Sequence, residues 1–397
     1  MNMGMNINMT KLFSRTDQSI FGRWWWTVDR VMLAAFIILM ICGVMLVTTA
    51  SPPVAERLNY GQYHFINRHL IVLVPAFALM IGMSLLNPRT VWRVASIVFI
   101  GGILAMIAVL FFGIEVKGAH RWLPMPGFSL QPSEFIKPSF AIVAAWMLAK
   151  QKENPEFPGN KIAYGLFGIT ALLLVLQPDF GMTVLLGCIF GAQVLLAGLS
   201  WRFVGILCGA ASAAMVAAYF IFDHVKSRFD RFFSPDAGDT YQVDQALQAM
   251  REGGLFGAGP GQGMVKLHIP DAHADFIFAV AGEEMGLLFA GFIVLLFAFI
   301  VRRGFNRIMD SNDMFVILAS GGLLVMFGLQ ALIHIGANVH MLPAKGMTLP
   351  FISYGGSSLL SVSFAAGVIL ALTRRKSRQG IARGSRIARG GMAMGKV

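Results

Sequence analysis

Residues 275–301 read DFIFAVAGEEMGLLFAGFIVLLFAFIV, and this stretch decides the fold class. Its three charged residues, Asp275, Glu283 and Glu284, all lie in its first half. The remainder is apolar, and about 20 such residues form a helix that crosses the hydrocarbon core of a bilayer. We therefore interpret the stretch as a transmembrane helix whose charged end meets one membrane surface.

Comparable apolar runs recur along the whole chain of 397 residues, which is 56% hydrophobic and 13% charged. Soluble domains are usually about a quarter charged. The sequence thus predicts an all-α, polytopic integral membrane protein with about ten transmembrane helices. The expected helices span roughly 31–49, 70–87, 92–112, 132–149, 161–177, 180–198, 202–222, 275–301, 313–337 and 352–373.

This arrangement divides the chain into a cytoplasmic N-terminal segment (1–30), a transmembrane domain (31–373) and a basic cytoplasmic tail (374–397). Within the domain, residues 223–274 form a large outer loop between the seventh and eighth helices. With ten spans, 21 of the 32 Lys and Arg residues share a side with both termini. The positive-inside rule therefore predicts cytoplasmic termini. The tail has eight basic residues and no acidic one, which favours anionic lipid headgroups as its partner and not nucleic acid.

Four glycines, Gly257, Gly259, Gly261 and Gly263, have the spacing of a nucleotide-binding loop. They follow no predicted strand and open no immediate helix, so the dinucleotide interpretation fails. We expect a hinge or a close backbone turn there instead. With no nucleotide site, an enzyme of this kind would receive an activated substrate through the membrane, on a lipid carrier with its own leaving group.

The densest polar cluster contains His268, Asp271, His273 and Asp275, where the outer loop enters the eighth helix. Asp275 could be a helix N-cap, because Asp is favoured at that position. It could equally be a general base at the membrane surface. A third interpretation is a hard divalent ion held by Asp271, His273 and Asp275, since the spacing fits no zinc motif.

A second group consists of Arg121, Gln131, Ser133, Glu134 and Lys137 around the start of the fourth helix. Residues three apart share a helix face, so Glu134 and Lys137 can pair. Charges in membrane helices are costly and usually face a cavity or each other. A structural ion pair and a functional site both remain open here.

Two further groups carry polar side chains in apolar surroundings. Adjacent Glu283 and Glu284 point about 100° apart, so at most one faces a central cavity directly, and we expect a buried, partnered carboxyl for one of them. The last group is Lys345 with Ser353, Tyr354, Gly355 and Ser357. It predicts either close helix packing through small residues or a surface for phosphate oxygens.

These groups, taken together and in this order, resemble one family, the SEDS proteins of bacterial shape, elongation, division and sporulation. The resemblance extends from about residue 29 to 375 and is most like the division members. The blocks that carry it are 118–122, 131–137, 177–181, 241–245, 253–263, 273–284 and 342–358. Ala274 and Asp271 depart from the usual pattern, where Thr and Glu are common, whereas Asp275 matches.

The resemblance implies a peptidoglycan glycosyltransferase that polymerises lipid II at the outer face of the cytoplasmic (inner) membrane, at the division septum. It implies that Asp275 is catalytic and takes the proton of the acceptor sugar's hydroxyl. Arg121, Lys137 and Lys345 are then candidates for the pyrophosphate. The expected substrate-binding residues are Arg121, Gln131, Ser133, Glu134, Lys137, His273, Lys345, Ser353, Tyr354, Gly355 and Ser357.

A divalent ion, Mg or Mn, is a further expectation, with Asp275 as a candidate ligand; no nucleotide or organic cofactor is expected. The family implies a class B penicillin-binding protein of the FtsI type and other division proteins as partners. Three alternatives stay open: a lipid II flippase, an elongation polymerase like RodA, and a scaffold without activity.

Overall fold

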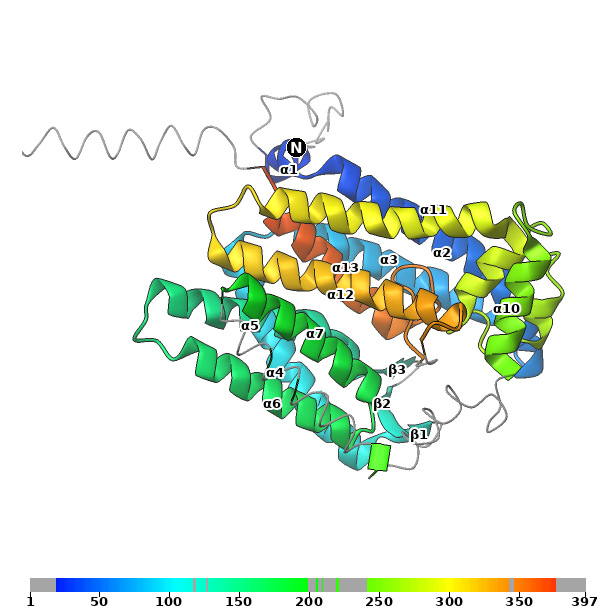
Figure 1. Ribbon diagram of the computed structural model, residues 1–397, viewed down its shortest axis with the longest axis horizontal. Helices are drawn as coiled ribbons and strands as arrows, with labels where there is room; N and C mark the ends of the chain where they lie inside the picture. Colours follow the sequence, from blue (N-terminus) through cyan, green and yellow to red (C-terminus); the bar gives the residue numbers. More distant parts are fainter. Residues whose placement is uncertain are drawn as a thin grey trace, which may run out of the picture.

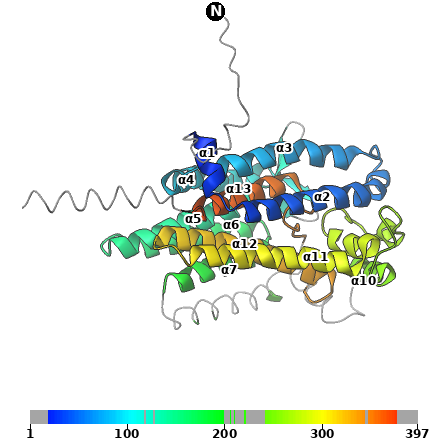
Figure 2. The same cartoon turned by 90° about the horizontal axis from the view of Figure 1, so that it is seen from above.

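Long helices lie side by side along the long axis of the molecule, and a small sheet lies at one end (Figures 1 and 2). The computed structural model describes residues 19–116, 119–125, 128–198, 205, 209, 219–220, 241–342 and 346–375. The helices are α1 (Ile20–Thr27), α2 (Arg30–Arg57), α3 (His64–Ser84), α4 (Pro88–Phe112), α5 (Pro132–Glu153), α6 (Gly159–Leu176), α7 (Phe180–Leu196), α10 (Tyr241–Gly253), η2 (Val265–His268), α11 (Ile277–Ile308), α12 (Met314–Asn338) and α13 (Gly356–Leu372).

Nine of the ten expected transmembrane helices are present among the described residues, namely α2 to α7 and α11 to α13. Six of these are long and apolar enough to cross a membrane, while α7 and α13 are shorter and α5 carries charges. The tenth, expected at 202–222, lies outside the described residues apart from a few positions. The fold class of a polytopic, helical membrane protein is confirmed.

Acidic or amide side chains mark where several of these helices begin. Asp29 precedes α2 and accepts hydrogen bonds from the backbone N–H groups of Val31 (3.1 Å) and Met32 (3.2 Å). Asp313 caps α12 in the same way, and Asn87 caps α4. Such caps satisfy N–H groups that the first helical turn leaves free. They therefore fix the start of each span just outside its apolar run.

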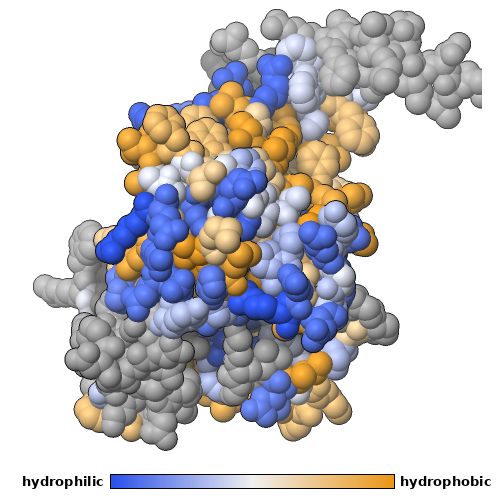
Figure 3. Space-filling model, turned by 90° about the vertical axis from the view of Figure 1, so that its right-hand side faces the viewer, coloured by the Kyte–Doolittle hydropathy of each residue, from blue (hydrophilic) through white to orange (hydrophobic). Residues whose placement is uncertain are grey.

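The segment between α4 and α5 contains an antiparallel sheet. Its strands are β1 (Ile114–Val116), β2 (Ala119–Met125) and β3 (Phe128–Leu130), in the order β1-β2-β3. The described part of the outer loop likewise forms α10 and η2, at the same end (Figure 1). Hydrophilic residues spread across this end, with hydrophobic ones along its flank, as expected where a bundle leaves the bilayer (Figure 3).

The glycine run packs on a kink in α11. Gly286 has φ +82° and ψ 172° inside the helix, which interrupts the regular hydrogen bonding. The loop after α10 supplies the missing partners: Ala258 and Gly259 donate to the carbonyls of Glu283 and Glu284, both at 2.9 Å. In return, Leu287 donates to the carbonyl of Gly254 at 2.9 Å. The expectation of a close backbone turn is confirmed, and the outer loop is fastened to α11.

Replacing Gly257 with Ala should destabilise the protein by roughly 2–4 kcal/mol. Gly257 has φ +83°, and a Cβ there would overlap the backbone carbonyl of Glu284. Gly261 is the matched control, because it has φ +76° and open space around it, so that only the conformational cost applies. Thermal unfolding in detergent measures the stability of both variants. An equal loss of stability in the two would contradict the packing explanation.

Candidate functional site

Asp275 lies in a turn that precedes α11 at the end of the bundle that carries α10 and the sheet. The N-cap residue of the helix is Phe276, directly before Ile277, so the N-cap interpretation of Asp275 is wrong. The turn closes at Asp271, which has φ +53° and whose carbonyl accepts hydrogen bonds from the N–H groups of Ala274 (2.9 Å) and Asp275 (3.0 Å). Asp275 is partly exposed.

Distant parts of the chain hold this turn by its backbone. Asn338 on α12 donates to the Asp275 carbonyl at 3.0 Å and accepts from the Ala279 N–H at 3.1 Å. From the segment before α13, the Ser353 hydroxyl donates to the Ala274 carbonyl at 2.8 Å, and the Tyr354 N–H donates to the His273 carbonyl at 2.9 Å. On α2, Arg57 donates to the carbonyl of Ile269 at 2.7 Å. The position of the carboxylate is thus set by several elements at once.

The carboxylate of Asp275 borders Gly346. A Cβ on Gly346 would lie 3.5 Å from Oδ2 of Asp275, and the glycine has φ +61°. The segment that leads into α13 therefore forms one side of the space around this carboxylate. Lys345, the expected phosphate-binding lysine, is outside the described residues.

The His273 ring is packed between two aromatic rings. Its centroid lies 4.6 Å from that of Phe65 and 5.0 Å from that of Tyr354. Burial lowers the pKa of His273 to about 4, with Arg57 acting in the same direction and Asp271 opposing it. The imidazole is therefore neutral near neutral pH and supplies no positive charge for a phosphate. Burial also raises the pKa of Tyr354, against the opposing effect of Arg68.

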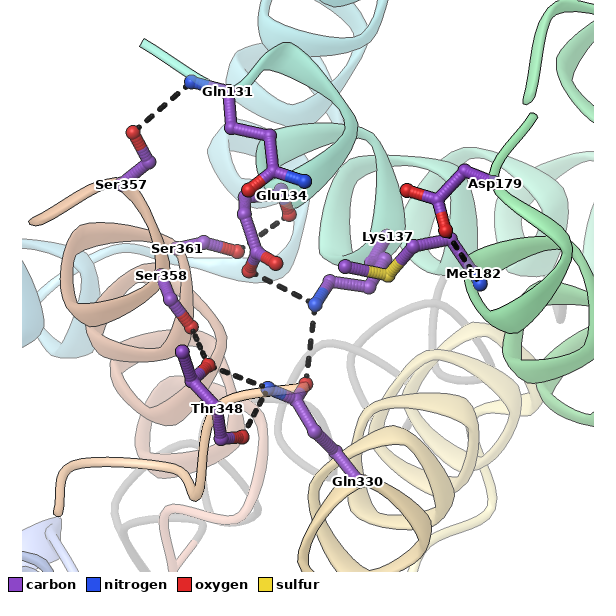
Figure 4. A network of polar contacts seen from close by, with 10 residues as sticks. All are labelled: Gln131, Glu134, Lys137, Asp179, Met182, Gln330, Thr348, Ser357, Ser358 and Ser361. Carbon is purple, nitrogen blue, oxygen red and sulfur yellow. Dashed lines mark hydrogen bonds and ion pairs between the residues drawn. The ribbon is translucent and has the colours of Figure 1, made fainter. Parts of the chain in front are cut away.

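A buried polar network crosses from α5 to α12 and on to α13 (Figure 4). Lys137 pairs with Glu134 at 2.9 Å, and the side chains are 3% and 5% exposed. The same ammonium donates to Oε1 of Gln330 at 3.2 Å, and the Gln330 amide donates to the Thr348 carbonyl at 3.0 Å. The Thr348 hydroxyl shares a 2.6 Å hydrogen bond with Ser358. Because Thr348 is two residues from Gly346, this network supports the segment that borders Asp275.

Three residues of α12 that the sequence interpretation missed hold the site together. Gln330 and Asn338 make the contacts above, and the His334 ring lies 2.6 Å from the Met347 carbonyl. They are four residues apart in a mostly apolar helix and thus share one face. Polar residues inside membrane spans are usually functional or paired, and that spacing was the available signal.

Arg121 is engaged with the turn between α6 and α7. Its Nε donates to the Gln177 carbonyl at 3.1 Å, another nitrogen donates to the Pro178 carbonyl, and Asp179 lies 3.8 Å away. Asp179 in turn accepts from the Met182 N–H at 3.3 Å and caps α7. Arg121 thus donates two hydrogen bonds to this turn and lies near the Asp179 carboxylate.

The remaining candidates around α5 and α13 make contacts within the fold. Ser357 accepts from the Gln131 N–H at 3.1 Å, which joins the starts of α13 and α5. Ser353 accepts from the Leu349 N–H at 2.8 Å. Ser133 is buried, and Gly355 precedes the first residue of α13. Ser357 and Ser353 thus position the backbone around the site, whereas the Ser133 hydroxyl has no hydrogen-bond partner among the described residues.

Glu283 and Glu284 are both buried and both partnered. The Glu283 carboxylate accepts from the N–H groups of Val265 (2.7 Å) and Lys266 (3.0 Å). Glu284 pairs with the Lys266 ammonium, which also donates to the Thr49 carbonyl at 3.0 Å. The pair therefore fastens η2 to α11 and α2, as expected for buried carboxyls that have found partners.

Among the described residues, no three His, Cys, Asp or Glu side chains come together as metal ligands. Asp271, His273 and Asp275 do not form the expected cluster, since the His273 ring is packed between aromatic rings. The described side chains therefore form no three-donor metal site on their own.

Comparison with known proteins gives a consistent result. Residues 29–378 match a family model of cell cycle proteins that covers FtsW, RodA and SpoVE. A probable peptidoglycan glycosyltransferase FtsW from Caulobacter vibrioides is 46% identical over 373 residues, covering 94% of this chain and 96% of that protein. One from Escherichia coli O6:H1 is 35% identical, with 90% and 89% covered.

Solved structures share the fold at 21% identity. One chain has a TM-score of 0.73 and covers 88% of this chain and 98% of its own length. Its structure is described as "Structural coordination of polymerization and crosslinking by a peptidoglycan synthase complex". The rod shape determining protein RodA of Thermus thermophilus has a TM-score of 0.66, with 89% and 99% covered.

Proposed function

This chain belongs to the FtsW/RodA/SpoVE family of cell cycle proteins, and from that premise we propose that it is a peptidoglycan glycosyltransferase that polymerises lipid II. The observation that supports the proposal most directly is the partly exposed carboxylate of Asp275. It lies in a turn held by α2, α12 and the segment before α13, at the end of the bundle away from the described chain ends.

In the proposed reaction, Asp275 accepts the proton of the 4-hydroxyl of the acceptor's terminal N-acetylglucosamine. That oxygen attacks the anomeric carbon of the donor's N-acetylmuramic acid and forms the new glycosidic bond. The bond between that carbon and the lipid pyrophosphate breaks, and the pyrophosphate leaves with the electron pair. A positioned base of this kind contributes about 10²–10⁴-fold to the rate.

The leaving pyrophosphate requires positive charge. Lys345 is our candidate, because it is the neighbour in sequence of Gly346, which borders Asp275. Lys137 is buried against Glu134 and Arg121 is engaged with the α6–α7 turn, so we assign both to holding the site. Gln131, Ser133, Ser353, Tyr354, Gly355 and Ser357 belong to the same framework in this proposal.

The described residues offer a divalent ion no cluster of three side-chain donors, so substrate phosphates would have to complete its coordination. Mg²⁺ in other proteins is commonly bound through one or two carboxylates and substrate phosphates. The proposal assigns any such ion to Asp275 and the pyrophosphate of the substrate.

We place the protein in the cytoplasmic membrane with both termini inside and Asp275 outside, as the distribution of basic residues favours. Septal synthesis during division is the proposed setting, and the FtsW relatives support it. The proposed partner is a class B penicillin-binding protein of the FtsI type. The polymerization and crosslinking complex that contains a structural relative supports this pairing.

Lipid II polymerisation by the purified protein in detergent, with and without its cognate transpeptidase, tests the proposal. Glycan strands should form, because no membrane leaflets are needed for glycosyl transfer. Glycan formation would exclude a flippase or a scaffold as the sole role. Failure to form glycan even with the transpeptidase present, by protein that remains folded, would overturn the proposal.

A further inference from the structure

A pocket of about 360 Å³ lies at the end of α11 opposite to Asp275. It is lined by Phe299, Arg302, Arg303, Asn306, Arg307 and Asp310. The apolar run of α11 ends at Val301, so the arginines begin where the helix leaves the hydrocarbon core. The pocket is therefore at the depth where lipid headgroups lie.

The walls of the pocket combine an apolar and a cationic surface. Phe299 is 39% exposed, and the guanidinium of Arg303 lies 5.9 Å from its ring centroid. Asn306 adds a neutral amide one turn further on. An occupant with a hydrocarbon part and an anionic part would match both surfaces.

Two of the arginines are held in place by one buried carboxylate. Asp29 accepts from Nε of Arg303 at 2.9 Å and from Nε of Arg307 at 2.7 Å. Although burial favours the neutral acid, these hydrogen bonds and one from Met32 outweigh it and lower the pKa of Asp29. The carboxylate stays ionised, and the two guanidinium groups are ordered before any ligand arrives, which reduces the entropy cost of binding.

Hydrogen-bond donors remain available after these contacts. Arg302 is exposed and has no partner among residues the structure describes, so its whole guanidinium is available. The three arginines outnumber the two carboxylates nearby, Asp29 and Asp310. The pocket is thus net positive, and guanidinium groups favour bidentate contact with phosphate oxygens.

Neighbouring residues identify this end of the bundle as a membrane interface. The guanidinium of Arg30 lies 5.6 Å and 5.3 Å from the ring centroids of Trp25 and Trp26. Aromatic residues of this kind gather at headgroup level. Ile20 and Phe21 of α1 are 64% and 57% exposed at the same end, as in a helix that lies on a bilayer.

We propose that this pocket binds the phosphate of an anionic phospholipid headgroup, with Arg302 as a direct contact and the lipid chain along Phe299. The Asp29 carboxylate aligns Arg303 and Arg307 as further donors. An acidic peptide of a partner protein would satisfy the arginines but would not need the apolar wall at headgroup depth. The proposal is independent of the glycosyltransferase activity.

Native mass spectrometry of the purified full-length protein with cardiolipin, phosphatidylglycerol or phosphatidylethanolamine tests this proposal. Arg302→Gln should weaken binding of one anionic lipid about tenfold, while thermal unfolding stays unchanged. The matched control is Arg89→Gln, which removes the same charge at the same end from an exposed arginine without a described partner. That control should stay within about twofold of the wild type.

Several results would overturn the proposal. An equal loss of lipid binding in Arg302→Gln and Arg89→Gln would show that the lipid responds to general surface charge and not to this pocket. Equally strong binding of phosphatidylethanolamine would show that the pocket recognises only the lipid chain. Displacement of the lipid by glycerol phosphate as effectively as by phosphatidylglycerol would assign the pocket to a free anion. Unchanged lipid binding by Arg302→Gln with weakened transpeptidase binding would assign it to a protein partner.

Discussion

Lipid II polymerisation should fall by about 10²–10⁴-fold when Asp275 is replaced with Asn, while thermal unfolding stays close to that of the wild type. The amide has nearly the same shape as the carboxylate but cannot accept the proton of the attacking hydroxyl. The described contacts that hold the turn use the backbone of residues 269–275, so the substitution leaves them in place. A gel-based assay of glycan length with purified protein measures the loss.

Asp271→Asn is the matched control for this variant. It neutralises a carboxyl in the same turn, and Asn tolerates the φ of +53° that Asp271 adopts. This control should retain activity within a fewfold of the wild type. A comparable loss of activity in both variants would assign the effect to the negative charge of the turn. Full activity of Asp275→Asn would rule out Asp275 as the general base.

The second large effect is on stability. Lys137→Met should destabilise the protein by about 3–5 kcal/mol, because it leaves the Glu134 carboxylate buried without its partner. The variant also removes the hydrogen bond to Gln330, which supports the segment that borders Asp275. Thermal unfolding in detergent and the polymerisation assay should therefore both show a decrease.

The same helix provides an exposed control. Lys150 and Glu153 also pair three residues apart, at 3.3 Å, but their side chains are 44% and 65% exposed. Lys150→Met should cost less than about 1 kcal/mol. Adding Glu134→Gln to Lys137→Met should recover part of the loss by removing the buried charge. If Lys137→Met destabilised the protein no more than Lys150→Met does, burial would not determine how much the Glu134–Lys137 pair contributes to stability.

The sequence was sufficient to predict the helical membrane fold, because each transmembrane helix is a long run of apolar residues. Helix ends were harder: α11 continues to Ile308 and α2 to Arg57, because polar residues extend both helices beyond the hydrocarbon. The short sheet was missed because its strands are at most seven residues long and lie among Gly and Pro residues, which are typical of loops.

The candidate site was predicted in part. Pairing of Glu134 with Lys137 followed from their spacing, and the structure confirms it. The role of Gln330 and Asn338 did not follow, because their partners, backbone groups and the Lys137 ammonium, are distant in sequence. The N-cap interpretation of Asp275 failed since the helix starts two residues later, which propensity alone does not resolve.

The turn that carries Asp275 depends on contacts from residues 57, 338, 353 and 354. Synthesis proceeds from the N-terminus, so the last of these contacts forms only after the ribosome has passed residue 354. A nascent chain that stopped at 345 would contain the whole turn with Arg57 and Asn338, but without the contacts from Ser353 and Tyr354. The contacts around this turn are therefore complete only late, when the final span enters the membrane.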